Sequence, residues 1–314
     1  MSRALRIEFP GAIYHVMARG VAGMPVFRDD ADRLMLLQEI EAQVRLGVLV
    51  VHAFCLMLNH IHLLCETPRA GLGRTMHDIL GNFAASLNRL HKRAGHLWQG
   101  RYKAILVQDG LYLLRCSRYI HLNPHKAGID ADFRYPWSSY RGYLGGAAFP
   151  WVCTDRILRH FSGAGKYQEF VDDRADDCAD PFKQATAGIV YGDPEFVKRI
   201  YRVANHTGGQ EDQPAIRLLR RSALEPSIET VLAAIDAALP EASECQKRRC
   251  LVWALHTHTW LKGSAIAREA GLKRSSVSKI IRSIKAGIWP GEEIAKRLAS
   301  ISQQLGLPQK SPSH

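Results

Sequence analysis

The sequence lacks the cysteine pattern of a disulfide framework or of a zinc ribbon. Its seven cysteines are odd in number and scattered, and no two of them form a C-x-x-C pair. This distribution argues against both classes and indicates reduced thiols in a cytoplasmic protein. The first ten residues also lack an apolar core, because Arg3, Arg6 and Glu8 interrupt them. No secretory signal peptide is therefore expected.

One long stretch, residues 47–65, has no Lys, Arg, Asp or Glu and imitates a membrane span. It contains His52, Asn59, His60 and His62, which would be costly in hydrocarbon, so we expect no membrane segment. Two buried strands joined by a tight turn explain the stretch better. No internal repeat is apparent either, which argues against a solenoid.

The charge is unevenly distributed along the 314 residues, whose formal net charge is +12. Residues 1–150 hold 18 basic and 11 acidic side chains, residues 151–214 hold 8 and 11, and residues 215–314 hold 16 and 8. Two basic ends thus flank an acidic middle. Such ends suggest a polyanionic partner, most simply nucleic acid, although a solvated basic surface explains the charge equally well.

The first 150 residues alternate between strand and helix patterns. Apolar and β-branched runs predict strands over 13–18, 48–57, 60–65 and 102–107. Helical spacing predicts helices from Asp29-Asp30 onward, over 75–93 and over 111–122. The first six elements are those of a ferredoxin-like unit, with one helix appended. We therefore expect an α+β domain over residues 1–150, with a four-stranded antiparallel sheet and helices on one face.

The rest of the chain divides by composition. Residues 151–214 form the expected acidic connecting segment, ending in a linker over 206–214. Residues 215–305 show helical patterns over 228–239, 245–257, 264–270 and 275–285, which predict an all-α domain. Residues 306–314 are expected to be a disordered tail.

The all-α domain contains the pattern of a helix-turn-helix over residues 264–281. It has a small residue at Ala267, a turn glycine at Gly271 and apolar residues at Leu272, Val277 and Ile280. We expect Ser275 to cap the second helix. The polar and basic face of that helix is predicted to contact DNA through Ser275, Ser276, Lys279 and Arg282. A plain helical bundle is the alternative.

The leading chemical feature is the run Asn59-His60-Ile61-His62. Residues i and i+2 of a strand point to the same face, so His60 and His62 present two imidazoles side by side while Ile61 points to the core. Such a pair is a natural platform for a divalent metal. A pair of hydrogen-bonded sheet histidines is the alternative interpretation.

A second feature is the pair Tyr119 and Asn123, which share one helical face at i, i+4. A phenolic nucleophile and an oxygen ligand would then lie one turn apart. Pro124 disfavours helical geometry at Asn123, so the helix is expected to end there. Tyr112, seven residues before Tyr119, is a rival nucleophile about 10 Å away along the axis. A buried tyrosine and an asparagine cap are the alternative.

Other titratable groups lie near these two features in the sequence. His15 and His52 fall on strands and are expected to be core or sheet-surface histidines, whereas His121 is expected to be structural or to contact DNA. Several cations surround the predicted site and could hold phosphates or be solvated: Arg19, Arg101, Lys103, Arg115 and Arg118.

Taken together, these motifs resemble the REP-associated branch of the IS200-type transposases, within the HUH endonuclease superfamily. The resemblance covers roughly residues 1–145. It runs through Gly11-Ala12-Ile13-Tyr14-His15-Val16, Met57-Leu58-Asn59-His60-Ile61-His62-Leu63-Leu64, Leu97-Trp98-Gln99-Gly100-Arg101-Tyr102-Lys103, Arg118 to Pro124 and Pro136-Trp137-Ser138-Ser139-Tyr140. A weaker motif follows at residues 188–197.

The resemblance implies a mechanism. His60, His62 and Asn123 would bind Mg²⁺ or Mn²⁺, and Tyr119 would attack a phosphate of single-stranded DNA beside a hairpin, leaving a 5′-phosphotyrosine link. Related insertion-sequence transposases often have Gln at the position of Asn123, which is one methylene longer. One tyrosine per chain implies a homodimer or sequential encounters of a monomer.

Two other functions have to be weighed. A domesticated protein would bind such palindromic repeats without cutting them, although the intact set of His60, His62, Tyr119 and Asn123 argues against this. A relaxase-like nickase shares the chemistry, but such enzymes often use a third histidine or paired tyrosines, and neither is evident in the sequence.

Overall fold

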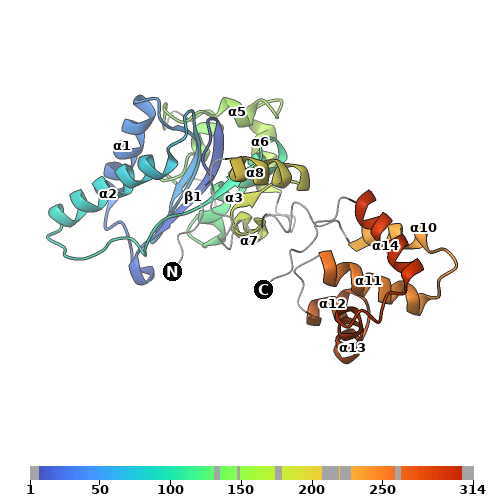
Figure 1. Cartoon of the computed structure of the whole chain (residues 1–314). Coiled ribbons are helices and arrows are strands. Elements are labelled where there is room, and N and C mark those ends of the chain that lie inside the picture. Colours follow the sequence, from blue (N-terminus) through green and yellow to red (C-terminus); the bar gives the residue numbers. More distant parts are fainter. Residues whose placement is uncertain are drawn as a thin grey trace. The chain divides into compact units, whose positions relative to one another are not determined.

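The computed structural model describes residues 7–130, 135–146, 149–173, 179–206, 219, 228–258 and 263–305. The chain divides into two compact units, residues 1–216 and residues 217–314. The N-terminal unit is mixed α and β, and the C-terminal unit is helical (Figure 1). This is the α+β class predicted from the sequence.

The sheet of the N-terminal unit has the order β2-β3-β1-β4-β5. Its strands are β1 (Ala12–Arg19), β2 (Val50–Leu56), β3 (His60–Thr67), β4 (Lys103–Val107) and β5 (Val190–Tyr191). Among the first four strands each neighbouring pair is antiparallel, as expected for a ferredoxin-like unit. The short β5 pairs in parallel with β4 and was not predicted.

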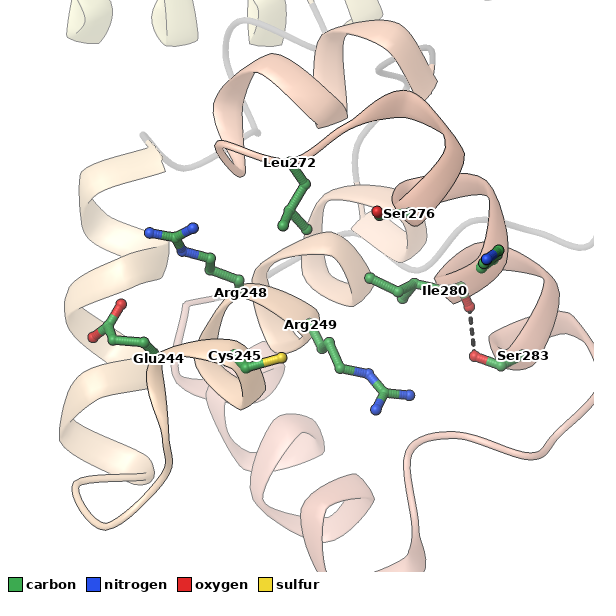
Figure 2. A pocket seen from close by; sticks show the side chains of 9 residues that line it. Glu244, Cys245, Arg248, Arg249, Leu272, Ser276, Ile280 and Ser283 are labelled. Atoms are coloured by element: carbon green, nitrogen blue, oxygen red, sulfur yellow. Dashed lines mark hydrogen bonds between the residues drawn. The ribbon is translucent and has the colours of Figure 1, made fainter.

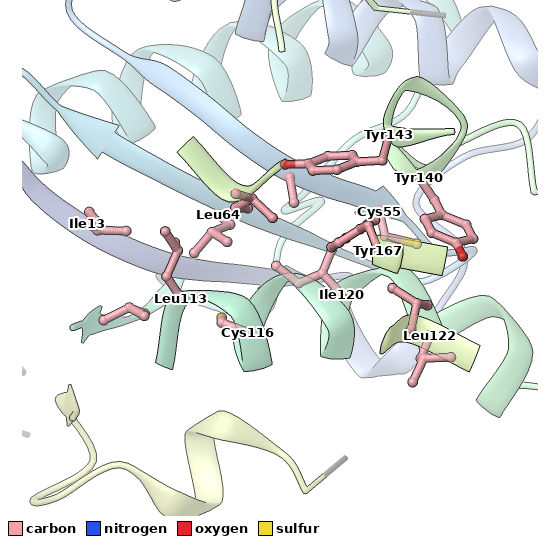
Figure 3. Close-up of a cluster of buried hydrophobic side chains, with 14 of the residues drawn as sticks. Ile13, Cys55, Leu64, Leu113, Cys116, Ile120, Leu122, Tyr140, Tyr143 and Tyr167 are labelled. Atoms are coloured by element: carbon pink, nitrogen blue, oxygen red, sulfur yellow. The ribbon is translucent and has the colours of Figure 1, made fainter. Parts of the chain in front are cut away.

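Helices cover both faces of this sheet, so the expectation of helices on one face is corrected. Figure 3 shows Leu113, Cys116 and Ile120 of α3 (Leu111–Lys126) packed under a sheet face that includes Ile13 and Leu64. Alternation along β1 directs its other buried residues, such as Val16, to the opposite face. On that side lie α1 (Asp30–Arg45) and α2 (Leu72–Leu90) (Figure 1).

Helix α3 continues past its proline, so the predicted end at Asn123 is wrong. Pro124 removes only the hydrogen bond that its own nitrogen would have donated. The carbonyl of Asn123 accepts from Ala127 N at 3.0 Å, and that of Pro124 accepts from Ile129 N at 3.1 Å. Pro124 is itself buried, and its packing holds the last turn in place.

Residues 151–173 and 179–206 are part of the N-terminal unit, although the sequence suggested a connecting segment. Besides β5 they form α5 (Asp155–Leu158), α6 (Ala164–Asp172), α7 (Pro181–Gln184) and α8 (Pro194–His206). Tyr167 of α6 is fully buried and stacks on Tyr143 of α4 (Tyr140–Tyr143), with ring centroids 4.6 Å apart. His121 hydrogen-bonds to the Tyr167 hydroxyl at 2.7 Å and to Ser139 Oγ at 2.8 Å, which makes it a structural residue.

The C-terminal unit has five described helices around one apolar cluster. They are α10 (Ile228–Ala238), α11 (Glu244–His258), α12 (Gly263–Glu269), α13 (Arg274–Lys285) and α14 (Glu292–Gln304). Helices α12 and α13 form the expected helix-turn-helix, and its turn glycine, Gly271, has a φ of 62°. Helix α13 begins at Arg274 and Lys273 occupies the cap position without a side-chain bond, so Ser275 does not cap it. The predicted linker beyond residue 206 and the tail lie outside the described residues.

No helix in the described ranges is long and apolar enough to cross a membrane. The uncharged stretch that imitates a span is divided between β2 and β3, as expected.

Candidate active site

The two predicted ligand histidines lie side by side on β3. The ring centroids of His60 and His62 are 4.9 Å apart and the rings are nearly perpendicular, while Ile61 between them is buried. The two-residue period of the strand places both imidazoles on the face that α3 covers. The pair therefore opens toward the helix that holds Tyr119.

Each ring of the pair is held through its Nδ1 atom. His60 Nδ1 lies 2.7 Å from Asn59 Oδ1, and His62 Nδ1 lies 2.9 Å from His15 Nε2. Asn59 is itself anchored, because its Nδ2 donates to the carbonyl of Gly23 at 3.1 Å. The Nε2 atoms of His60 and His62 take no part in these bonds and are the nitrogens available to a ligand.

Burial keeps these imidazoles uncharged at neutral pH. Burial and, as the smaller cause, the nearby Arg19 guanidinium together lower the pKa of His60 to about 4. Burial, followed by the neighbouring His15 and His60, holds the pKa of His62 well below its usual value. Burial likewise lowers the pKa of His15 to about 3. Neutral imidazole is the form that ligates metals.

Tyr119 is the tyrosine that reaches the histidines. Its half-buried ring meets the ring of His62 edge-on, with centroids 5.7 Å apart, and lies 5.9 Å from the ring of His15. Tyr112 instead packs edge-on against Tyr191 of β5, at 4.9 Å. The rival nucleophile is thus engaged by a different part of the sheet.

Asn123 lies one turn from Tyr119, as predicted, and is tied to it by a hydrogen bond. Its Nδ2 donates to the carbonyl of Tyr119 at 2.7 Å. Among the described residues, no hydrogen bond joins Asn123 to His60 or His62, and no group of three His, Cys, Asp or Glu side chains could hold a metal. Its role as third ligand therefore stays a prediction.

The predicted phosphate contacts have different surroundings. Arg19 is exposed and pairs with His60 across the strands, and Lys103 is exposed and pairs with Met17, the partner of His62. Cross-strand partners share a face, so both cations flank the histidines. Arg101 is exposed at a separate groove of about 770 Å³ between α2 and residues 95–102.

Arg118 does not fit the DNA-contact role expected of it. Only 6% of this residue is exposed, and its guanidinium lies 5.3 Å from the ring centroid of Phe170 on α6. Neighbouring residues on a helix point about 100° apart, so Arg118 faces the core when Tyr119 faces the histidines.

Three residues near the site were missed or misjudged in the sequence. His15 was taken for an ordinary sheet histidine, and Phe182 of α7, with its ring centroid 4.5 Å from that of His15, gave no signal. Lys126 places its ammonium 5.3 Å from the ring centroid of Tyr119. Its spacing of seven residues from Tyr119, two helical turns, could have revealed it.

The C-terminal unit presents the predicted DNA-binding helix at its surface. Ser275, Lys279 and Arg282 are exposed on α13, and Ser276 is partly buried. A groove of about 780 Å³ runs between α11 and α13 (Figure 2). Its cations are Arg248, Arg249 and Lys279, and its carboxylate is Glu244. The guanidinium of Arg249 stacks on Trp289 at 5.1 Å.

Comparison with known proteins agrees with the resemblance noted in the sequence. Residues 9–123 match the family model described as "Transposase IS200 like". A solved structure of a REP-associated tyrosine transposase bound to a REP hairpin is 17% identical, with a TM-score of 0.42, over 48% of this chain and 89% of that chain. No curated protein matches the sequence. The matched residues include β1 to β4, both histidines and Tyr119, so this N-terminal part of the chain is similar to the IS200-like transposases.

Proposed function

We propose that the N-terminal unit is a metal-dependent endonuclease and transposase that cleaves and rejoins single-stranded DNA at hairpin repeats. The observation that carries the proposal is the contact between the rings of Tyr119 and His62, whose centroids are 5.7 Å apart. The ring centroid of His60 lies 4.9 Å from that of His62. A nucleophile beside a pair of ligand-type imidazoles is the minimum that such a reaction needs. A DNA substrate would place the protein in the cytoplasm.

The donors at this site suit a divalent cation. His60 Nε2 and His62 Nε2 would hold it, and Asn123 Oδ1 would complete the set from α3. A bound metal would polarise a phosphate oxygen of the scissile bond. Two imidazoles with an amide oxygen suit Mn²⁺ better than Mg²⁺, because Mg²⁺ prefers oxygen ligands alone.

The residues of the chain account for the remaining steps. The deprotonated oxygen of Tyr119 forms a bond to phosphorus, the bond from phosphorus to the 3′ oxygen breaks, and that oxygen takes up a proton. The product is a 5′-phosphotyrosine and a free 3′-hydroxyl. The ammonium of Lys126 beside the Tyr119 ring favours the negative phenolate. The covalent link conserves the energy of the broken bond, so rejoining requires no ATP.

We infer that the C-terminal unit binds DNA through α13. Its exposed Ser275, Lys279 and Arg282 form a polar, cationic surface of the kind that enters a major groove. Arg248, on the other side of the adjoining groove, is also exposed and adds positive charge for a phosphate.

The deciding experiment incubates the full chain with end-labelled hairpin DNA and Mn²⁺. Wild type should form a protein–DNA adduct that survives denaturation, and Tyr119→Phe should form none. Tyr112→Phe is the matched control, since it removes a hydroxyl from the same helix away from the histidines, and it should keep the adduct.

Other outcomes distinguish the alternatives. An adduct that is lost in Tyr112→Phe and kept in Tyr119→Phe would show that Tyr112, and not Tyr119, is the nucleophile. Binding without an adduct across a broad set of hairpins would favour a non-cleaving repeat-binding protein. Cleavage without strand transfer to a second DNA would favour a relaxase-like nickase. Light scattering of the complex would tell a monomer from a homodimer.

A further inference from the structure

His15 of β1 is bonded to one of the two proposed ligands. Its Nε2 lies 2.9 Å from His62 Nδ1, and the two ring centroids are 5.1 Å apart. The register pairs His62 with Met17 and His15 with Leu64, so the two histidines are diagonal neighbours on one face of the sheet. The hydrogen bond links residues that lie 47 positions apart in the chain.

The His15 ring is held tightly in its position. The residue is 0% exposed, its ring centroid lies 4.5 Å from that of Phe182, and the ring of Tyr119 meets it edge-on at 5.9 Å. Its Nδ1 has no hydrogen-bond partner among the described residues. The bond to His62 is therefore the one polar interaction that orients this ring within the described part of the chain.

The positions of the protons follow from the proposed ligand role. A neutral imidazole carries one proton, and a metal needs the lone pair of His62 Nε2. The proton of His62 must then lie on Nδ1 and be donated to His15 Nε2. His15 in turn must carry its own proton on Nδ1. Partners that receive the second nitrogen of a ligating histidine fix its tautomer and the orientation of its ring.

We propose that His15 is a positioning residue, which accepts the Nδ1 proton of His62 and so presents His62 Nε2 to the metal. The inference rests on the proposed metal-dependent function. Because His15 also contacts Tyr119, the same side chain sets the separation between ligand and nucleophile. A histidine buried only for packing would neither bond to a proposed ligand nor contact the proposed nucleophile.

The test measures Mn²⁺ binding to the full chain without DNA, by titration calorimetry. His15→Leu should weaken Mn²⁺ binding by ~10–100-fold, the usual effect of removing such a partner. His15→Gln should retain most of the affinity, because its amide oxygen can accept the same proton. The control is His52→Gln, since His52 is an equally buried histidine of the same sheet that bonds to Cys153 and Glu66 instead.

A second measurement needs no substitution and decides the matter if His15→Leu does not fold. In the ¹⁵N spectrum of labelled histidines with Mg²⁺ present, His62 should carry its proton on Nδ1. A proton on Nε2 of His62, or unchanged Mn²⁺ affinity in a folded His15→Leu, would overturn the role of His15. The parent proposal fails separately, if wild type binds no Mn²⁺ and forms no adduct on hairpin DNA.

Discussion

At the scale of single residues, Tyr119 is surrounded by groups of different chemistry. The rings of His62 and His15 lie at 5.7 and 5.9 Å, and the ammonium of Lys126 lies 5.3 Å from its ring centroid. The imidazoles are neutral, whereas Lys126 places a positive charge beside this ring. Its charge should matter most when the phenolate forms.

Replacing Lys126 tests that idea. Lys126→Met should slow adduct formation on hairpin DNA roughly fivefold, as expected for the loss of about 1 kcal/mol of cation–ring interaction. Lys126→Arg keeps the charge and should remain close to wild type. Single-turnover rates at saturating DNA make the comparison, and equal rates for Lys126→Met and wild type would contradict it.

A pH dependence follows from the buried neutral histidines. Burial lowers the pKa of both His15 and His121 to about 3, whereas a histidine in the unfolded chain has a pKa of about 6.5. Below pH 6.5 the unfolded state therefore binds more protons, and stability falls as the pH drops toward 3. In that window, each of these histidines should lower the free energy of unfolding by about 1.4 kcal/mol for every pH unit of acidification.

Urea unfolding between pH 7 and pH 4.5 measures this effect. His121→Gln removes one titrating group and should lose stability less steeply with acid than wild type does, even if it is less stable at pH 7. If the free energy of unfolding falls equally steeply with pH in the two proteins, His121 is not the source of the dependence.

At the scale of elements, two helices carry the proposed functions in different ways. Helix α3 delivers Tyr119 and Asn123 to the face of β3 that bears the histidines, and it needs the turn beyond Pro124 to deliver Lys126 as well. Helix α13 has Val277 buried against its own unit and leaves Lys279 and Arg282 outside. Its proposed role is therefore to contact DNA through its exposed basic side chains.

The salt dependence of DNA binding tests α13. Lys279→Ala or Arg282→Ala should each weaken binding and flatten the slope of log affinity against log salt by about 0.7–0.9, the value of one lost phosphate contact. The control is Lys296→Ala on α14, an exposed lysine of the same unit that pairs with Glu292 at 3.1 Å. An equal change in the control would trace the effect to net charge alone.

At the scale of the whole molecule, each unit has its own apolar cluster. In the N-terminal unit the cluster joins the sheet and α3 to Tyr167 and Val171 of α6, and a separate cluster holds α10 to α14 together. The described residues of 151–173 and 179–206 belong to the N-terminal unit. The catalytic machinery proposed here lies wholly within the N-terminal unit.

A truncated protein tests this division. Residues 1–216 should unfold cooperatively and still form the Tyr119 adduct with Mn²⁺, while binding DNA more weakly than the full chain. A shorter protein ending at residue 150 should be unstable, because it loses Tyr167 and β5. Circular dichroism and adduct assays compare the two, and a stable, active 1–150 fragment would show that residues 151–206 are dispensable.

Local sequence patterns determined the features that depend on short spacings. The two-residue period of a strand was enough to place His60 and His62 on one face, and the i, i+4 spacing was enough to place Asn123 one turn from Tyr119. The same local patterns indicated four strands of the sheet and the helix-turn-helix. They could not show which tyrosine meets the histidines, since Tyr112 and Tyr119 share nearly the same helical face.

Only the tertiary structure decided that choice, because it depends on how α3 lies across the sheet. It also decided that His15 bonds to His62, that Arg118 is buried against Phe170, and that β5 pairs with β4. Each of these contacts joins segments far apart in the chain, and their formation depends on strand register and core packing. Neither can be derived from the residues that flank a motif.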